Sequence, residues 1–224
     1  MKLYYHPIST SSLIVMMFAA QEGIPLELQL IDLMNGEQRK PDYKALNPVG
    51  LVPMLEDDGF RLTESGAIIR YLAGKIGSAA YPTDLKKRAR VDEIMQWFYS
   101  NFYKDLAIGM VYPQLLPHHK RQTDEVQAGT IEWGKTKAEN WLGILDKDII
   151  GPSHKLLCGE QITLADYVGA EMVKMGELVG CEYRKFPNVC RWLNNMKGLK
   201  HWGKVHEAVE GFAASLKGKQ FVAI

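Results

Sequence analysis

Hydrophobic and polar residues follow two different periods along the first third of the chain. Residues 26–31 alternate with a period of two, which indicates a strand, and residues 2–5 read as another strand. The apolar run 13–20 is too long and too rich in alanine and methionine for a strand, so it predicts a helix over 10–22 that ends at Gly23. The pattern continues with a short helix over 41–46, strands over 53–56 and 60–62, and a helix over 64–75.

The last two predicted strands are joined by Asp57-Asp58-Gly59. This is a strong hairpin signal, because an Asp-Gly pair favours a tight two-residue turn. The resulting order is strand, helix, strand, helix, hairpin and helix. That order is typical of a thioredoxin-like α/β domain, which we expect over residues 1–77.

No convincing strand pattern follows the linker that we expect over residues 78–84. Thr163-Leu164-Ala165-Asp166 has the form of a capping box with aspartate in place of glutamate, so a helix is expected to begin there. Other helical patterns lie at 85–110, 123–146, 187–197 and 202–216. The predicted fold class is therefore α+β, with a thioredoxin-like N-terminal domain followed by an all-α domain over 85–224.

The two long helical patterns of the second domain carry more specific expectations. Trp133, Trp141 and Leu145 are spaced for one face of the helix over 123–146. Pro113 and Pro117 are expected to break the chain between the two long helices, because proline removes a backbone donor.

Composition narrows the class of protein. The net charge of +1 and the absence of aromatic residues among the basic residues 86–90 argue against nucleic acid as a partner. The sequence contains no run of eighteen apolar residues, so no membrane span is predicted. The N-terminal residues 1–7 do not form the apolar segment of a signal peptide. The three cysteines, Cys158, Cys181 and Cys190, have no zinc-binding spacing. We expect no metal or cofactor, and a reduced cytoplasmic setting.

The segment Asn47-Pro48-Val49-Gly50-Leu51-Val52-Pro53 is the strongest candidate for a binding loop. Pro53 disfavours the helical conformation at Val52, which is therefore expected to be extended, and the Val52 N–H and C=O have no obvious local partner. An extended residue of this kind can pair with an extended peptide ligand as an added strand would. The alternative is an ordinary tight loop between a helix and a strand.

Three motifs resemble one family. Val52-Pro53 is followed by Glu64-Ser65-Gly66-Ala67-Ile68, as in the glutathione-binding half of the cytosolic glutathione transferases. Residues 81–93, Tyr-Pro-Thr-Asp-Leu-Lys-Lys-Arg-Ala-Arg-Val-Asp-Glu, are similar to the start of the helical domain in theta-like members. Residues 162–166 match the family's folding motif. The chain most resembles the theta-like, serine-type (bacterial-style) members, which act in detoxification.

The resemblance implies how the thiol of glutathione is activated. Ser9 falls on the catalytic serine of theta-like members, whose hydroxyl donates a hydrogen bond to the sulfur. Ser11 falls where beta-class members carry cysteine and is the alternative. The residue four positions after Ser9 is Leu13, where the family usually has arginine. Either hydroxyl could instead be a helix cap, because serine is favoured at that position.

The resemblance also implies the glutathione-binding residues. Val52 would pair with the cysteine backbone of glutathione beside a cis Pro53, and Glu64 and Ser65 would hold the γ-glutamyl group at a helix N-terminus. Gln38 and Lys40 could hold the glycyl carboxylate; the alternative for them is a solvated polar loop. For Glu64 and Ser65 the alternative is a helix cap with an acidic first turn.

Two function hypotheses follow. The first is an enzyme that conjugates glutathione, as co-substrate, to a small hydrophobic electrophile, with halide displacement as one form of the reaction. The second is a non-catalytic glutathione-binding or protein-interaction member of the same fold. The resemblance further implies a homodimer, although Ser100 stands where the theta pattern has an aspartate that reaches the partner's site.

Overall fold

A four-stranded sheet with the strand order β2-β1-β3-β4 forms the centre of the N-terminal part of the chain. In this computed structural model, which describes residues 1–224, β1 (Lys2–Tyr5) runs parallel to β2 (Glu27–Leu30). β3 (Met54–Asp57) runs antiparallel to both β1 and β4 (Phe60–Thr63). Asp58 and Gly59 have φ angles of 49° and 86°, so the predicted Asp-Gly turn joins β3 and β4.

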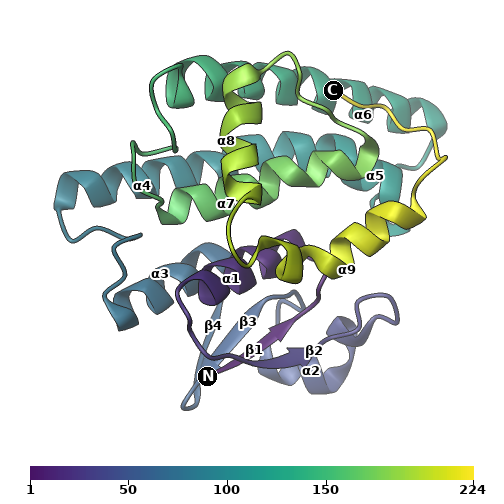
Figure 1. Cartoon of the computed structure of the whole chain (residues 1–224). Coiled ribbons are helices and arrows are strands. Elements are labelled where there is room, and N and C mark those ends of the chain that lie inside the picture. The colour runs from purple at the N-terminus through teal and green to yellow at the C-terminus, as the bar shows by residue number, and fades with distance from the viewer. The chain divides into compact units, whose positions relative to one another are not determined.

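Helices lie along the sheet as expected for a thioredoxin-like domain. α1 (Thr10–Gln21) and α3 (Ser65–Ile76) pack against each other (Figure 1). α2 (Pro41–Leu46) meets the face of the sheet that carries Tyr4, because the rings of Tyr4 and Tyr43 are 6.1 Å apart. Leu3, which alternation places on the opposite face, is completely buried. The predicted α/β arrangement is confirmed.

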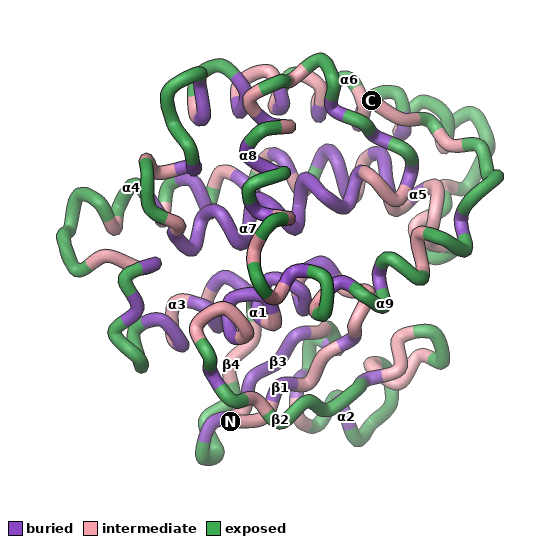
Figure 2. The backbone as a smooth tube through the Cα atoms, in the orientation of Figure 1, coloured by how far each residue is buried: buried purple, intermediate pink, exposed green.

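The chain from α4 (Leu85–Trp97) onward is helical, which confirms the predicted all-α part. α7 (Leu164–Lys174) lies inside this part, and all of its residues are buried (Figure 2). The element bounds are α4 (Leu85–Trp97), η2 (Phe98–Phe102), η3 (Lys104–Val111), α5 (Tyr112–Leu115), η4 (Pro117–His119), α6 (Asp124–Ile144), η5 (Leu145–Ile150), α7 (Leu164–Lys174), η6 (Met175–Val179), α8 (Pro187–Lys197) and α9 (Trp202–Ser215).

The predicted capping box opens α7. The Asp166 carboxylate accepts hydrogen bonds from the Thr163 N–H at 2.8 Å and from the Thr163 hydroxyl at 3.0 Å. It also accepts from the Leu157 N–H at 2.9 Å and from the Trp192 ring N–H of α8 at 3.0 Å. Asp166 is fully buried, so this single carboxylate joins the loop before α7, the start of α7 and α8.

Two expectations about the long helices are wrong. Pro113 does not end the first of them: Tyr112–Leu115 is helical and follows two π-helical segments, and the chain leaves the helix at the extended Leu116, before Pro117. Trp133 does not share a buried face with Leu145, because Trp133 is 62% exposed. The buried stripe of α6 is Ile131, Gly134, Ala138 and Leu142 instead, and Gly134 allows close approach, since a Cβ there would lie only 2.5 Å from the Gly109 backbone of η3.

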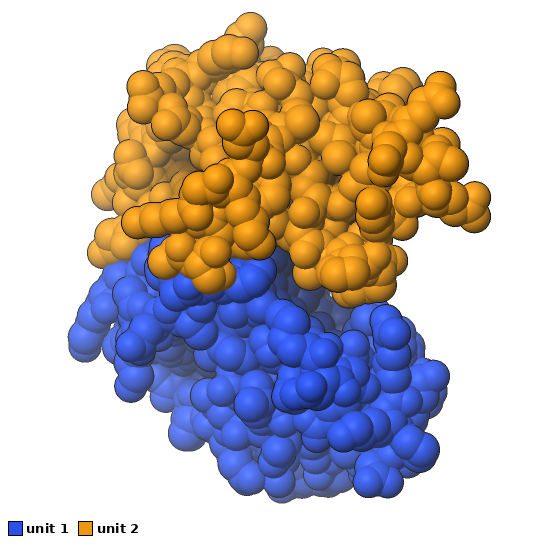
Figure 3. All heavy atoms as spheres, turned by 90° about the vertical axis from the view of Figure 1, so that its right-hand side faces the viewer, with its two compact units in different colours: residues 1–82, 199–212 blue, residues 83–198, 213–224 orange.

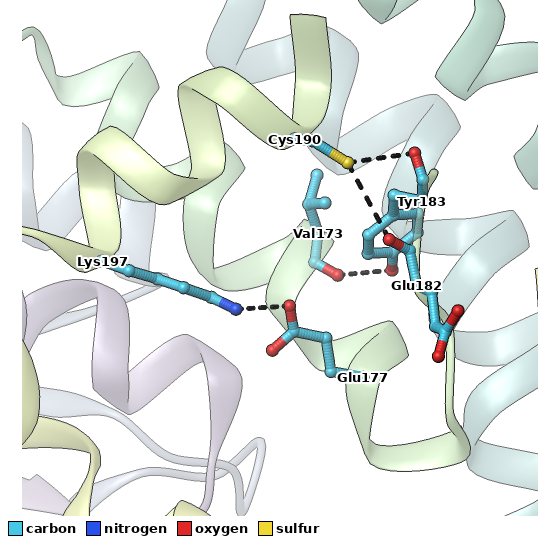
Figure 4. A network of polar contacts seen from close by, with 6 residues as sticks. All are labelled: Val173, Glu177, Glu182, Tyr183, Cys190 and Lys197. Carbon is cyan, nitrogen blue, oxygen red and sulfur yellow. Dashed lines mark hydrogen bonds and ion pairs between the residues drawn. The ribbon is translucent and has the colours of Figure 1, made fainter. Parts of the chain in front are cut away.

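Polar contacts also fix the turn between η6 and α8 (Figure 4). Tyr183 has a φ of 56°, and its buried hydroxyl donates to the Val173 carbonyl at 2.6 Å. The Cys190 thiol donates to the Tyr183 carbonyl at 3.1 Å, and Lys197 pairs with Glu177 at 2.5 Å. These contacts hold α7, the turn and α8 together.

Contacts divide the chain into two units (Figure 3). The first is Met1–Pro82 with Leu199–Phe212, and the second is Thr83–Gly198 with Ala213–Ile224. Most of α9 thus groups with the sheet-containing unit, whereas the sequence pattern assigns it to the helical domain. The predicted domain boundaries after residues 77 and 84 stay a prediction.

Candidate functional site

Sheet register gathers four loops at one edge of the first unit. Tyr4 pairs with Met54, and Met54 pairs with Thr63, so the end of β1, the start of β3 and the end of β4 are level. Tyr5 pairs with Leu30 in the parallel partner, so the end of β2 lies at the same edge. The segments that follow or precede these ends carry Ser9, Gln38 with Lys40, Val52 with Pro53, and Glu64 with Ser65. The register therefore places the ends of these four loops at one edge, and Ser11 lies in the first turn of α1, directly after the loop that carries Ser9.

Ser9 caps α1 and keeps a hydrogen-bond donor for a ligand. Its backbone is extended, its N–H donates to the His6 carbonyl at 3.0 Å, and its side-chain oxygen accepts from the Ser12 N–H at 3.4 Å. A hydroxyl has two acceptor lone pairs and one proton, so accepting the Ser12 N–H does not use the proton. The capping role and a donor role are therefore compatible for the half-buried Ser9.

The neighbouring hydroxyls have different surroundings. Ser12 is completely buried, and its oxygen accepts the His6 N–H at 3.3 Å, so Ser12 fixes the loop from inside. Ser11 is half-buried in the first turn of α1, and its hydroxyl makes no hydrogen bond within the chain. The geometry thus leaves Ser9 and Ser11 as the two hydroxyl candidates.

The Val52–Pro53 peptide bond is cis, as the resemblance implies. The Val52 N–H and C=O make no backbone hydrogen bond, which leaves them for an extended ligand. The preceding carbonyl, that of Leu51, accepts from the Tyr43 hydroxyl at 2.7 Å and from the Asn47 side-chain amide at 2.8 Å. α2 and its end thus hold the loop in place from one side.

Glu64 has an unusual backbone conformation at the start of α3. Its φ of 66° and ψ of 113° lie in a region that costs a non-glycine residue about 1–3 kcal/mol and that is concentrated at functional sites. Its carbonyl accepts from the Ala67 and Ile68 N–H groups, both at 2.9 Å, and its side chain is exposed and does not cap the helix. Ser65, the first residue of α3, is 3% exposed. The α3 N-terminus, with its positive end of the helix dipole, lies at the edge where the four loops meet.

Gln38 lies in the short helix η1 (Glu37–Arg39), next to Lys40. The side-chain oxygen of Gln38 is buried without a hydrogen-bond partner, and Lys40 is exposed. Gly50 fixes the distance between this helix and the binding loop, since a Cβ at Gly50 would lie 2.8 Å from the Gln38 backbone oxygen and Gly50 has a φ of 67°. Gly50 is thus needed both for its conformation and for close approach.

All three cysteines are free, and burial raises the pKa of the Cys158 thiol to about 11, so this thiol stays protonated at neutral pH. No group of three or more His, Cys, Asp and Glu side chains is arranged to hold a metal ion. None of the helices combines the length and the apolar character that crossing a membrane requires.

Comparisons with known proteins identify the family of the chain. Residues 1–74 match the model of the glutathione S-transferase N-terminal domain, and residues 105–200 match that of the C-terminal domain. The chain is 32% identical to glutathione S-transferase theta-2B of Homo sapiens over 89% of its own length and 81% of that protein. It is also 32% identical to glutathione S-transferase D7 of Drosophila melanogaster, over 98% of its length and 92% of that protein.

Solved structures give the same result. The crystal structure of human glutathione transferase theta-2 in complex with glutathione superposes with a TM-score of 0.86 at 29% identity, covering 99% of this chain and 92% of that one. A Nilaparvata lugens delta-class glutathione transferase superposes with a TM-score of 0.82 at 30% identity, covering 96% and 98%. The chain therefore belongs to the glutathione S-transferase family. Within it, the chain is a theta-like glutathione transferase.

Two features of this edge could not be predicted from the sequence. The left-handed conformation of Glu64 has no signal in the local residue pattern, because glutamate is not a residue that marks positive φ. His6 lies directly after β1 and contacts the loop that carries Ser9, but an isolated histidine before a proline matches no motif.

Proposed function

We propose that this transferase conjugates the thiolate of glutathione to a small hydrophobic electrophile, with Ser9 as the hydroxyl that stabilises the thiolate. Val52 would pair with the cysteinyl backbone of glutathione, beside the cis Pro53. Glu64 and Ser65 would hold its γ-glutamyl group, and Gln38 and Lys40 its glycyl carboxylate. The observation that carries the proposal is the register that brings these four loops to one edge of the sheet.

The chemistry needs no general base, because the Ser9 hydroxyl donates to the thiolate and the thiol proton passes to water. A free thiol has a pKa near 8.5 and is mostly protonated at neutral pH. A hydrogen bond to an ionised group is worth about 1.5–3 kcal/mol, which corresponds to a pKa lower by one to two units. The α1 N-terminus beside Ser9 adds a smaller favourable field. The thiolate that results is the nucleophile, and it forms the carbon–sulfur bond as the leaving group departs.

The choice between an enzyme and a non-catalytic binding protein is tested with a panel of electrophiles. Aryl and alkyl halides, epoxides and peroxides would each be incubated with glutathione and the purified chain. Turnover of one class above the uncatalysed rate supports the proposal, and release of halide from alkyl halides would identify halide displacement. Binding of glutathione without turnover of any class would favour the non-catalytic alternative.

Replacement of Glu64 by glutamine is expected to weaken glutathione binding by one to two decades. The change removes the charge that would pair with the γ-glutamyl ammonium, an interaction worth about 1.5–3 kcal/mol. Calorimetric titration measures the affinity. The matched control is a glutathione analogue whose γ-amino group is replaced by hydrogen. Wild type and Glu64→Gln should bind this analogue equally, and an equal loss for both ligands would contradict the pairing.

We also propose that the chain is a homodimer in the cytoplasm. Dimers are typical of the family, the side chain of Leu85 at the start of α4 is 79% exposed, and three free cysteines suit a reduced compartment. One chain has a mass of 25.3 kDa. Sedimentation velocity at micromolar concentration should therefore give a species of about twice that mass. A single species near the mass of one chain would contradict the dimer.

A further inference from the structure

His6 is the first residue of the loop between β1 and Ser9, and its hydrogen bonds hold this loop to the start of α1. Its carbonyl accepts the Ser9 N–H at 3.0 Å, and its own N–H donates to the buried Ser12 hydroxyl at 3.3 Å. Its ring Nδ1 accepts the Ile8 N–H at 3.4 Å. His6 itself is only 8% exposed. Three hydrogen bonds thus run from this one residue to positions 8, 9 and 12.

The contact with Ile8 requires a neutral imidazole. An Nδ1 that accepts a hydrogen bond cannot carry a proton, so the ring proton is on Nε2. Burial lowers the pKa of His6, and the negative charge of Asp32, which follows β2, acts in the opposite direction. Asp32 is thus the charged group against which the effect of burial on His6 is set. His6 is therefore neutral at pH 7.

Protonation of the His6 ring would turn Nδ1 from a hydrogen-bond acceptor into a donor. The imidazolium carries N–H groups on both ring nitrogens, so Nδ1–H would face the Ile8 N–H and the contact would be lost. Ile8 directly precedes Ser9, whose N–H closes the turn onto His6. A change at Ile8 therefore shifts the backbone that aims the Ser9 hydroxyl.

Taking the proposed role of Ser9 as its basis, we propose that His6 is a positioning residue whose neutral ring holds the Ile8–Ser9 turn in its productive shape. Two groups then make the reaction sensitive to acid. One is the thiol of bound glutathione, and the other is His6. The two can be separated, because the first changes the amount of thiolate whereas the second changes the rate that each thiolate supports.

The sign of the effect follows from the lowered pKa. His6 remains neutral, and the turn intact, above its own pKa in the folded protein, which lies below the ordinary value of 6.5. As the pH falls through that lowered pKa, the fraction of molecules with a neutral ring decreases. The turnover number per bound thiolate is therefore expected to fall on the acid side, in addition to the loss of thiolate.

The test compares two substitutions that differ only in the acceptor. His6→Asn places a side-chain oxygen near the position of Nδ1 but does not titrate, and His6→Leu removes the acceptor and keeps an apolar side chain. For each variant, kcat is measured from about pH 5 to pH 8 at saturating glutathione, and bound thiolate is followed by ultraviolet absorbance. His154→Asn, at an exposed histidine of the second unit, is the matched control.

Three results are expected. His6→Asn keeps kcat near neutral pH within about threefold, and its kcat per thiolate no longer falls in acid. His6→Leu loses about tenfold in kcat, while its KM for glutathione changes less. His154→Asn behaves as wild type. If His6→Leu fails to fold, an NMR titration of the wild type without glutathione serves instead: the Ile8 amide should shift with the same pKa as the His6 ring.

The outcomes separate this inference from the function that it rests on. A wild-type protein that forms no thiolate with bound glutathione overturns the proposed function. A normal thiolate together with the same acid dependence of kcat per thiolate in wild type and His6→Asn overturns the role of His6 alone. An Ile8 amide that does not respond to the His6 titration also overturns it.

Discussion

Replacement of Asp166 by alanine is expected to lower the free energy of unfolding by about 3–5 kcal/mol. The reason is that the N–H groups of Thr163, Leu157 and Trp192 all lose the buried carboxylate to which they donate, and a buried donor without a partner costs about 1–3 kcal/mol. Burial raises the pKa of Asp166, while the donors around it act to lower that pKa. Chemical denaturation followed by fluorescence measures the change.

The matched control for Asp166→Ala is Thr123→Ala at the start of α6. Thr123 is an exposed cap whose side chain accepts the Val126 N–H at 3.2 Å. Loss of such a cap typically costs about 1 kcal/mol, because water can satisfy the exposed donor. A loss for Asp166→Ala no larger than that for Thr123→Ala would contradict the account. The folded fraction of Asp166→Ala should keep its glutathione affinity, because every proposed glutathione contact lies in the first unit.

Replacement of Ser9 by alanine is expected to reduce the rate near neutral pH by one to two decades. It removes a hydrogen bond to the thiolate that is worth about 1.5–3 kcal/mol, and each 1.36 kcal/mol corresponds to a factor of ten. Glutathione affinity should fall much less, because Val52, Glu64 and Ser65 still hold the peptide. Raising the pH should restore much of the rate, since the thiol then ionises without help.

The pH response distinguishes thiol activation from a serine nucleophile. A nucleophilic Ser9 would lose nearly all activity at every pH when replaced by alanine, and the wild type would form a covalent adduct on the serine. Ser9→Ala also removes the hydrogen bond by which the Ser9 side chain caps the Ser12 N–H, and this loss lowers stability. Ser9→Gly separates the two effects, because glycine at an N-cap costs only a few tenths of a kcal/mol. Both variants should lose the same catalytic factor although their stabilities differ.

Local signals predicted most of the secondary structure. The strand at 2–5 and the helices at 41–46 and 187–197 have the predicted bounds, because proline or a clear change of period marks their ends. The helix that contains Pro113 was not predicted, since whether proline stops a helix depends on the wider π-helical turns before it. The exposure of Trp133 was not predicted either, because the buried stripe of α6 is set by its close approach to Gly109 in another helix.

The candidate site, too, could be predicted from the sequence only where its features depend on neighbouring residues. Its loops could be found from Val52-Pro53 and Glu64-Ser65, since proline and a helix start leave signals in the local sequence. Their meeting at one edge depends on the register of Tyr4 with Met54, which is a long-range pairing. The part played by His6 was missed because it depends on the hydrogen bond between its ring and the Ile8 N–H, and neither residue type indicates it.

If Ser9 activates the substrate, it lowers the pKa of the thiol of bound glutathione. That pKa is measured by thiolate absorbance as a function of pH, at saturating glutathione, for wild type, Ser9→Ala and Ser11→Ala. We expect a thiol pKa one to two units higher in Ser9→Ala than in wild type, and no such rise in Ser11→Ala. A rise in Ser11→Ala alone would transfer the role to Ser11, and unchanged values in both variants would leave the hydroxyls as helix caps and contradict thiol activation by Ser9.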